Sequence, residues 1–171
     1  MKEIKTKEEV WGMKRMVAFV SALMLGVMVS VCSAESGADR LVKDRDMLGL
    51  RIAEVASQVS SLADKVGKMK TSKKKEEMME RLMLLETEAM LLSEAFGRVD
   101  KIVFGIDVLA SVVASGGYLS KANYQASAVV FDKAVKEAED SLRGLVNCSF
   151  CLPRTREIAE KTLEDLYEWW R

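Results

Sequence analysis

Apolar residues recur along this chain at alternating intervals of four and three, and this heptad periodicity restricts the fold more than any other feature of the sequence. The clearest series is formed by Leu41, Leu48, Ile52, Val55, Val59, Leu62, Val66 and Met69. Polar residues fill the positions between them, whereas a half-buried strand would alternate with a period of two. The pattern therefore predicts an amphipathic helix over about residues 38–69.

Three later segments share this periodicity and predict helices over about 72–114, 120–146 and 154–171. The stretches KMKTSKKK, SGGYLS and NCSFCLP interrupt the pattern between them. Ser120 is expected to cap the third helix, and Pro153 fits the first turn of the fourth. Because the connections are short, consecutive helices should run antiparallel, which predicts an all-α, up-and-down bundle of about four helices.

The half of the second predicted helix from Val99 to Ala114 is apolar on most sides. This composition predicts a central position in the bundle. Gly97, just before this half, and Gly105, within it, are expected either to kink the helix or to admit a close neighbour.

Composition excludes several classes of function. The chain has 26 basic and 26 acidic residues and a net charge of zero, which argues against a nucleic-acid-binding protein. It has no histidine, so the commonest general base and the commonest metal ligand are missing. No phosphate-binding loop, nucleophile elbow or Cys-His pair is present. The sequence therefore predicts a protein that is not an enzyme and holds no metal or cofactor.

The N-terminal region has the layout of an export signal. Lys14 and Arg15 precede an uncharged, mostly apolar run over residues 16–34, which matches the basic and apolar parts of a secretory signal. Met13 opens this pattern, so residues 1–12 are interpreted as the product of an upstream start codon. We therefore predict a signal segment over residues 1–31.

Cys32 follows the apolar run in the stretch MVSVCSAES, and three interpretations of it compete. In the first, Cys32 is the lipid-attachment site of a bacterial lipoprotein, although Val31 replaces the usual small residue before it. Alternatively, an ordinary signal is cleaved after Ala34, or the uncharged run stays as a membrane anchor. The first two leave an even pair of cysteines, as expected in an oxidising compartment, and the lipoprotein interpretation is favoured. Residues 32–37 then form a polar tether and 38–171 the bundle domain.

Cys148 and Cys151 form a Cys-x-x-Cys motif in the last predicted connection. The motif is known from thioredoxin-like redox proteins, but no strand pattern surrounds it here. A zinc site would need two more ligands, and the chain has no histidine to supply them. The motif therefore predicts a local disulfide that orients the last helix.

Two groups of residues are candidates for binding a partner. The first is the basic loop between the first two helices, with Lys70, Lys73, Lys74 and Lys75. The second is the C-terminal aromatic group, with Tyr167 and Trp169. The lysines suit an acidic or sulfated partner, or they only solvate a helix connection. The aromatic residues supply a buried anchor if they face outward, or they only close the end of the bundle.

The signal segment, the lipobox-like MVSVCSAES stretch, the polar tether and the histidine-free helical pattern together resemble the small outer-surface lipoproteins of spirochaetes. Within that group, the size and helical character are similar to the complement factor H-binding lipoproteins of relapsing-fever Borrelia. The resemblance implies a protein anchored by lipid on the outer-membrane surface that captures a host protein, with factor H as the expected partner. The alternative hypothesis is a periplasmic structural protein of the envelope that self-associates as a homo-oligomer.

Overall fold

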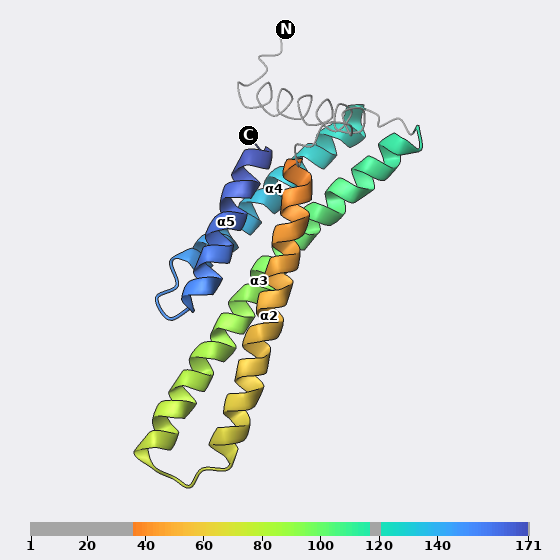
Figure 1. The fold of residues 1–171 in the computed structure, drawn as a ribbon. Helices are drawn as coiled ribbons and strands as arrows, with labels where there is room; N and C mark the ends of the chain where they lie inside the picture. The colour runs from red at the N-terminus through yellow and green to blue at the C-terminus, as the bar shows by residue number, and fades with distance from the viewer. Residues whose placement is uncertain (1–35, 117–120, 171) are drawn as a thin grey trace.

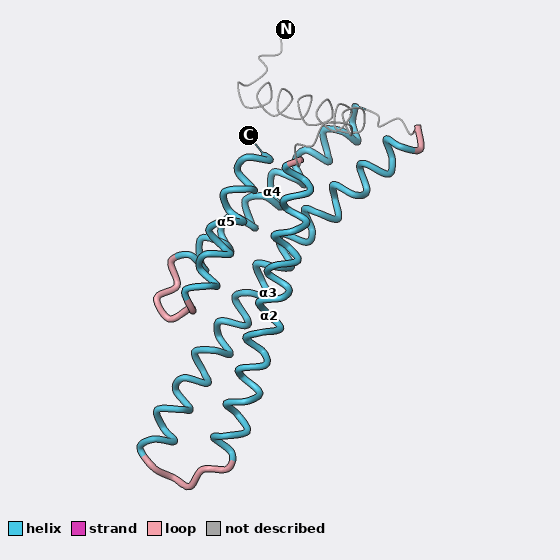
Figure 2. Tube along the Cα trace, in the orientation of Figure 1, coloured by secondary structure: helices cyan, strands magenta, loops and turns pink. Residues whose placement is uncertain are grey.

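The computed structural model describes residues 36–116 and 121–170, and within them every regular element is a helix (Figure 2). The four helices are α2 (Gly37–Gly67), α3 (Lys73–Ala114), α4 (Lys121–Val146) and α5 (Pro153–Trp170). The predicted all-α fold is confirmed, and each predicted boundary lies within two residues of the observed one.

Side-chain caps set the starts of the first two of these helices. The Ser36 hydroxyl accepts a hydrogen bond from the Asp39 amide at 3.2 Å, and the Asp39 carboxylate accepts one from the Ser36 amide at 3.2 Å. This reciprocal capping box starts α2 at Gly37, so the helix includes the last residue of the predicted tether. The Ser72 hydroxyl accepts a hydrogen bond from the Lys75 amide and starts α3 in the same way.

The helices pack in a closed up-and-down arrangement (Figure 1). α2 packs against α3 and α5, and α4 packs against the same two helices. The heptad residues of all four helices meet in one core. Its fully buried members include Leu41, Leu48, Val55, Leu92, Val99, Ile102, Ala138, Leu142, Leu145, Ala159 and Leu166.

The helices differ in length, and this makes the two ends of the molecule unlike each other. α3 has 42 residues and α2 has 31, whereas α5 has only 18. The end of α2 that leads to Gly67 and the start of α3 at Lys73 therefore extend beyond α4 and α5 as a two-helix projection (Figure 1), which we call the projecting hairpin. Its seam residues Leu62 and Leu82 are partly exposed, because no other helix covers them.

The predicted central position of Val99 to Ala114 is only partly correct. Val99, Ile102 and Val103 are buried, but Phe104 is 68% exposed and Val108 is 45% exposed. Each helix has neighbours on two sides only, so the outward face of α3 stays uncovered. Gly105 admits a close neighbour, since a Cβ atom there would lie 2.6 Å from Cζ of Phe131.

Candidate functional site

The end of the projecting hairpin carries a concentration of positive charge. Residues 64–75 contain six lysines and one aspartate. Five of the lysines are exposed, and we call them the basic tip: Lys65, Lys68, Lys70, Lys73 and Lys74. Because these side chains are solvated and gather where the chain turns, they form a surface that attracts anions.

Helix stability does not explain the lysines that begin α3. Lys73, Lys74 and Lys75 occupy the first three helical positions, and Glu76 is the only acid of the first turn. The N-terminus of a helix carries a partial positive charge, which disfavours each nearby cation by about 0.3–1 kcal/mol. A run of lysines at this position therefore costs some helix stability.

Lys75 differs from the other lysines of the predicted binding group. Its side chain is half-buried, and Nζ donates a hydrogen bond to the backbone carbonyl of Met69 at 3.1 Å. This bond closes the turn between α2 and α3. We therefore assign Lys75 to the structure of the turn and Lys70, Lys73 and Lys74 to its exposed surface.

Tyr167 does not face outward as a binding anchor would. It is half-buried, its hydroxyl donates to the carboxylate of Glu139 at 2.6 Å, and the same oxygen accepts from Arg143 at 2.6 Å. Burial and the bond to Glu139 raise the pKa of Tyr167, and the same bond lowers the pKa of Glu139. These contacts join α4 to α5.

Trp169 also packs against the bundle. Its ring centroid lies 5.5 Å from that of Trp170 and 6.3 Å from that of Phe131. A Cβ atom at Gly37 would lie 3.2 Å from Cβ of Trp169, so only glycine fits comfortably there. The indole therefore closes the end of the bundle where α2 begins and α5 ends.

The two candidate groups lie at opposite ends of the molecule. Trp169 lies beside Gly37 at the start of α2, whereas the basic tip follows the end of α2 at Gly67. With 31 residues at 1.5 Å each, α2 is about 46 Å long. The aromatic group therefore takes the second of its two predicted roles, closing the end of the bundle, and the basic tip remains as the candidate site.

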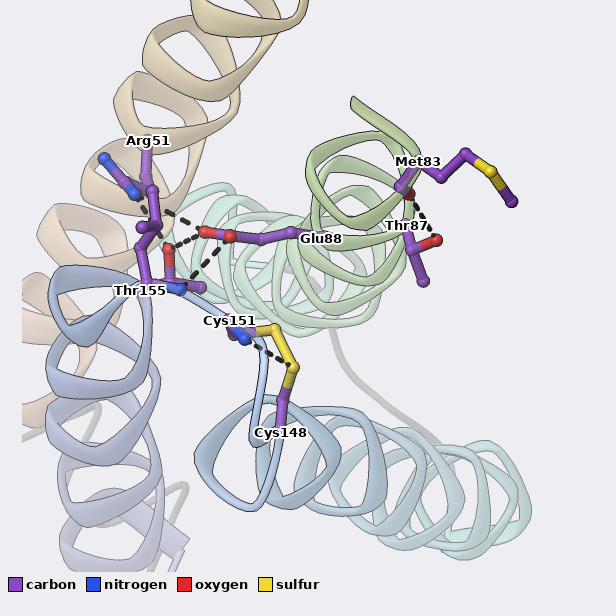
Figure 3. The surroundings of a disulfide bond; sticks show 8 residues. Arg51, Met83, Thr87, Glu88, Cys148, Cys151 and Thr155 are labelled. Atoms are coloured by element: carbon purple, nitrogen blue, oxygen red, sulfur yellow. Dashed lines mark hydrogen bonds and ion pairs between the residues drawn. A yellow bond between two sulfur atoms is a disulfide. The ribbon is translucent and has the colours of Figure 1, made fainter. Parts of the chain in front are cut away.

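A disulfide joins Cys148 to Cys151, with 5.3 Å between their Cα atoms, in the connection from α4 to α5 (Figure 3). The backbone amide of Cys151 also donates a hydrogen bond to the sulfur of Cys148. The Cys-x-x-Cys motif therefore closes the turn immediately before α5.

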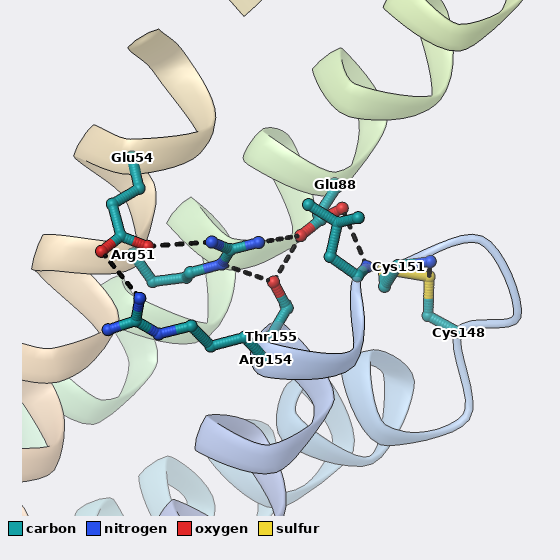
Figure 4. Close-up of polar contacts among 8 residues, drawn as sticks. Arg51, Glu54, Glu88, Cys148, Cys151, Arg154 and Thr155 are labelled. Carbon is teal, nitrogen blue, oxygen red and sulfur yellow. Dashed lines mark hydrogen bonds and ion pairs between the residues drawn. A yellow bond between two sulfur atoms is a disulfide. The ribbon is translucent and has the colours of Figure 1, made fainter. Parts of the chain in front are cut away.

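Glu88 organises a buried polar cluster beside this turn, and sequence analysis missed it (Figure 4). Its side chain is 1% exposed, and one carboxylate oxygen accepts a hydrogen bond from the amide of Leu152 at 3.1 Å. The other oxygen accepts from the hydroxyl of Thr155 and lies 3.4 Å from the guanidinium of Arg51. Glu88 lies four residues after Leu84 and three before Leu91, so an acid at helical spacing from two leucines was the available signal.

Arg51 connects the cluster to the surface. Its side chain is 5% exposed, and it donates hydrogen bonds to Thr155 at 2.8 Å and to Glu54 at 2.9 Å. Glu54 also pairs with the exposed Arg154 at 3.2 Å. Because Glu88 receives the amide that precedes α5, the cluster fixes where α5 begins against α2 and α3.

A second polar cluster lies where α2 meets α5. The ammonium of Lys161 donates to Asp44 at 2.7 Å and to Asp165 at 3.0 Å, and both carboxylates are nearly buried. Burial raises the pKa of Asp44 despite the contact with Lys161. Burial acts on Asp165 too, but the hydrogen bond from Lys161 and the positive charges of Lys161 and Arg40 outweigh it and lower its pKa. Lys161 therefore holds two acids that would otherwise repel each other.

Replacing Lys161 with Met is expected to lower the free energy of unfolding at pH 7 by about 1 kcal/mol, since the Lys161 side chain is itself largely exposed. Because the pKa of Asp165 is lowered in the fold, its ionised form stabilises the fold at pH values above the usual pKa of an aspartate. This contribution is lost as the pH falls and the carboxylate takes up a proton. Without Lys161 both carboxylates take up protons more readily. The loss should therefore shrink between pH 7 and about pH 3 in urea unfolding, because the acids become neutral.

The matched control is Lys133→Met, which removes an exposed lysine whose nearest carboxylate oxygen, on Glu137, lies 3.8 Å away. It should change stability little at either pH. A loss for Lys161→Met that is the same at both pH values would contradict the assigned role.

A shallow groove of about 720 Å³ runs between α2 and the start of α5, next to the Glu88 cluster. Met47, Leu50 and Ile158 line its apolar part, and Glu54 and Arg154 line its polar part. Arg51 also lines the groove. Arg51 pairs with Glu54 and Glu88, and Arg154 pairs with Glu54, so these charges are already used within the protein.

Cys32 and Ser120 lie outside the described residues. None of the helices in 36–116 and 121–170 is long and apolar enough to cross a membrane. In the same ranges, no three metal-ligating side chains gather as a metal site requires. Comparison with protein families, curated proteins and solved structures finds no match to the chain.

Proposed function

We propose that this is a lipid-anchored surface protein that captures a host protein through the basic tip of its projecting hairpin. The observation that carries the proposal is the separation of the two ends. Ser36 begins the described chain at one end of α2, and the exposed lysines follow its other end about 46 Å away (Figure 1). A lipid on Cys32, four residues before Ser36, would hold the first end at the membrane.

This geometry makes the bundle a spacer. The four-helix part lies near the anchor, where its core and its two buried polar clusters keep it rigid. The hairpin carries its lysines away from the membrane into reach of large proteins. Exposed lysines at a protruding tip raise the rate of encounter with an acidic surface.

The partner class follows from this chemistry. Lysine ammonium groups on flexible stems attract negative charge without demanding one fixed geometry. The tip therefore suits an acidic patch on a folded protein. The resemblance to spirochaetal surface lipoproteins makes complement factor H the first partner to test.

A self-associating envelope protein is the second candidate function. It is favoured by the exposed apolar side chains on the outward face of α3, which include Met83 and Phe104. Such a face on a folded monomer is typical of an interaction surface. The two functions are compatible, since this face and the basic tip use different residues.

The anchored-capture proposal is tested with Cys32→Ser. The full chain, expressed with labelled fatty acid, should incorporate the label, bind to phospholipid vesicles and retain a protein from host plasma. The Cys32→Ser chain should not incorporate the label, bind to the vesicles or retain the plasma protein on them, because it lacks the acyl chains that give membrane affinity. Label or vesicle binding that persists in the variant would refute the lipid anchor, and bare vesicles that retain the same plasma protein would refute capture.

A further inference from the structure

The end of the molecule opposite the basic tip is also a two-helix projection. It is formed by residues 108–114 of α3 and 121–130 of α4, which extend beyond the other two helices (Figure 1), and we call it the apolar arm. Trp170 of α5 stacks on Phe131 of α4, with 6.5 Å between the ring centroids. The part of α4 that precedes Phe131 therefore lies beyond Trp170, the last described residue of α5.

The start of α2 lies beside the apolar arm. Arg45 of α2 pairs with Asp100 of α3 at 3.5 Å, which fixes the register of these two antiparallel helices. Nine steps from this pair lead to Ser36 before α2 and to Leu109 on α3. α3 ends at Ala114, so it continues for about 8 Å beyond the level of Ser36.

The apolar arm carries almost no charge, in contrast to the other end of the molecule. Between Asp107 of α3 and Asp132 of α4 the sequence has a single charged residue, a lysine, whereas residues 64–75 at the other end have seven. Gly105 lies against the ring of Phe131, so Asp107 and Asp132 lie within about one turn of a common level. Charge on both helices therefore stops at one level, as at a boundary between water and an apolar medium.

Apolar side chains beside this boundary face outward. Val108 is 45% exposed, Val129 is 69% exposed and Val130 is 66% exposed. Phe104, one turn before Val108 on α3, is 68% exposed. Exposed apolar side chains that gather at one end of a folded protein are typical of a surface that meets a membrane or another protein.

Two indoles lie at the level where the apolar arm leaves the bundle. Trp169 and Trp170 are half-buried in the last turn of α5, and both rings pack near Phe131. Tryptophan is enriched at the interface between a membrane and water, because its ring is apolar and its N–H group is polar. The succession of charged helices, indoles and an uncharged arm is therefore that of a protein that enters a membrane interface.

We infer that the apolar arm dips into the bilayer that holds the lipid on Cys32. The inference rests on the lipid anchor proposed above, because this anchor sets where the membrane lies. Cys32 is four residues before Ser36, and four extended residues reach about 14 Å at most. The membrane surface would thus lie within reach of the arm. An apolar element of a peripheral protein enters the interface by about 5–10 Å, which matches the 8 Å by which α3 passes Ser36.

The second contact gives the molecule a direction. A lipid on a short tether alone would leave the bundle free to lie flat on the membrane. With the apolar arm also in the interface, one end of the bundle is held at two places. The projecting hairpin at the other end is then directed away from the membrane, with its basic tip in water.

Fluorescence quenching by lipids tests the contact. The full, lipidated chain carries an NBD probe on Ser115→Cys, directly after α3, or on Ser61→Cys, an equally exposed serine of the projecting hairpin. Both chains are bound to phosphatidylcholine vesicles that contain lipids with a doxyl group on the upper acyl chain. We expect about twofold quenching at position 115, with shielding from iodide in the water, and neither effect at position 61.

The outcomes separate this contact from the anchor. A chain that binds the vesicles without quenching at position 115 would overturn this inference and leave the lipid anchor in place. Shielding from iodide without quenching by the lipids would also overturn it, since a second copy of the chain would then cover the apolar arm. A chain that does not bind the vesicles would overturn the anchor and this inference together.

Added charge tests the same contact independently. Val108→Glu with Val112→Glu places two acids one turn apart on the apolar arm and should remove the quenching at position 115, whereas the lipid keeps the chain on the vesicles. Met79→Glu with Met83→Glu adds the same charge at the same spacing to exposed side chains of the projecting hairpin and should leave the quenching unchanged. Equal quenching in both variants would overturn the inference. If the first variant loses helical content, Val129→Glu with Val130→Glu takes its place, since these side chains are more exposed.

Discussion

Replacing Glu88 with alanine is expected to lower the free energy of unfolding by about 3–5 kcal/mol, the largest loss we expect from any single polar substitution in this chain. Glu88 is 1% exposed, and its carboxylate receives Arg51, Thr155 and the amide of Leu152. Without this carboxylate, the buried Arg51 guanidinium loses one of its two negative partners, and the Leu152 amide loses its hydrogen-bond acceptor. Urea unfolding followed by circular dichroism, with the disulfide intact, measures the loss.

Two variants separate the cluster from general effects on α3. Glu86→Ala removes an exposed acid of the same helix and should change stability by no more than about 0.5 kcal/mol. Arg51→Met combined with Glu88→Leu removes both buried charges and should recover much of the loss, since an apolar pair needs no partners. A loss below about 1 kcal/mol for Glu88→Ala would mean that the cluster does not hold α5 in place.

The heptad periodicity was sufficient to predict the helices, because the spacing of apolar residues in an amphipathic helix shows which of its faces is buried. The seam from Leu48 to Val66 and the interruption KMKTSKKK placed α2 and the start of α3 within two residues. The exposed lysines of the turn were also predictable, since a charged run between two seams has no apolar surface to cover.

The Glu88 cluster was not predictable, because its partners are distant in the sequence. Glu88 contacts Leu152 and Thr155, which are 64 and 67 residues away, and no local pattern links them. The orientation of Trp169 depends likewise on Gly37, at the other end of the chain. Both features arise only when α5 docks on α2.

The projecting hairpin results from the different lengths of the helices, and the heptad periodicity alone does not predict it. α5 is too short to reach the ends of α2 and α3, so the basic tip stands clear of the other helices. The exposed side chains of Phe104 and Val108 could not be told apart in the sequence, because the half of α3 from Val99 to Ala114 is apolar on most sides. Only the packed structure separates the buried Val103 from the exposed Phe104.

Replacing Lys73 and Lys74 with serine is expected to slow the association of an acidic partner about tenfold at low salt, since exposed charges steer encounter over long distances. The dissociation rate should change little, because solvated lysines contribute little to short-range contacts. The fold should remain intact, and α3 should gain slightly in stability, since two cations leave the positive end of its dipole. Lys133→Ser with Lys136→Ser makes the same charge change on exposed side chains of α4 and serves as the control.

We propose that the basic tip, held away from a lipid-anchored end, captures a host protein. The association rate of complement factor H with the full, lipidated chain on vesicles, measured between about 0.05 and 0.3 M salt, tests this proposal directly. We expect the rate to fall with salt for the wild type and for the α4 control. We expect it to be lower and nearly flat for the variant of the tip. Equal rates for all three chains at every salt concentration, or no binding of factor H or of any other plasma protein, would contradict the claim.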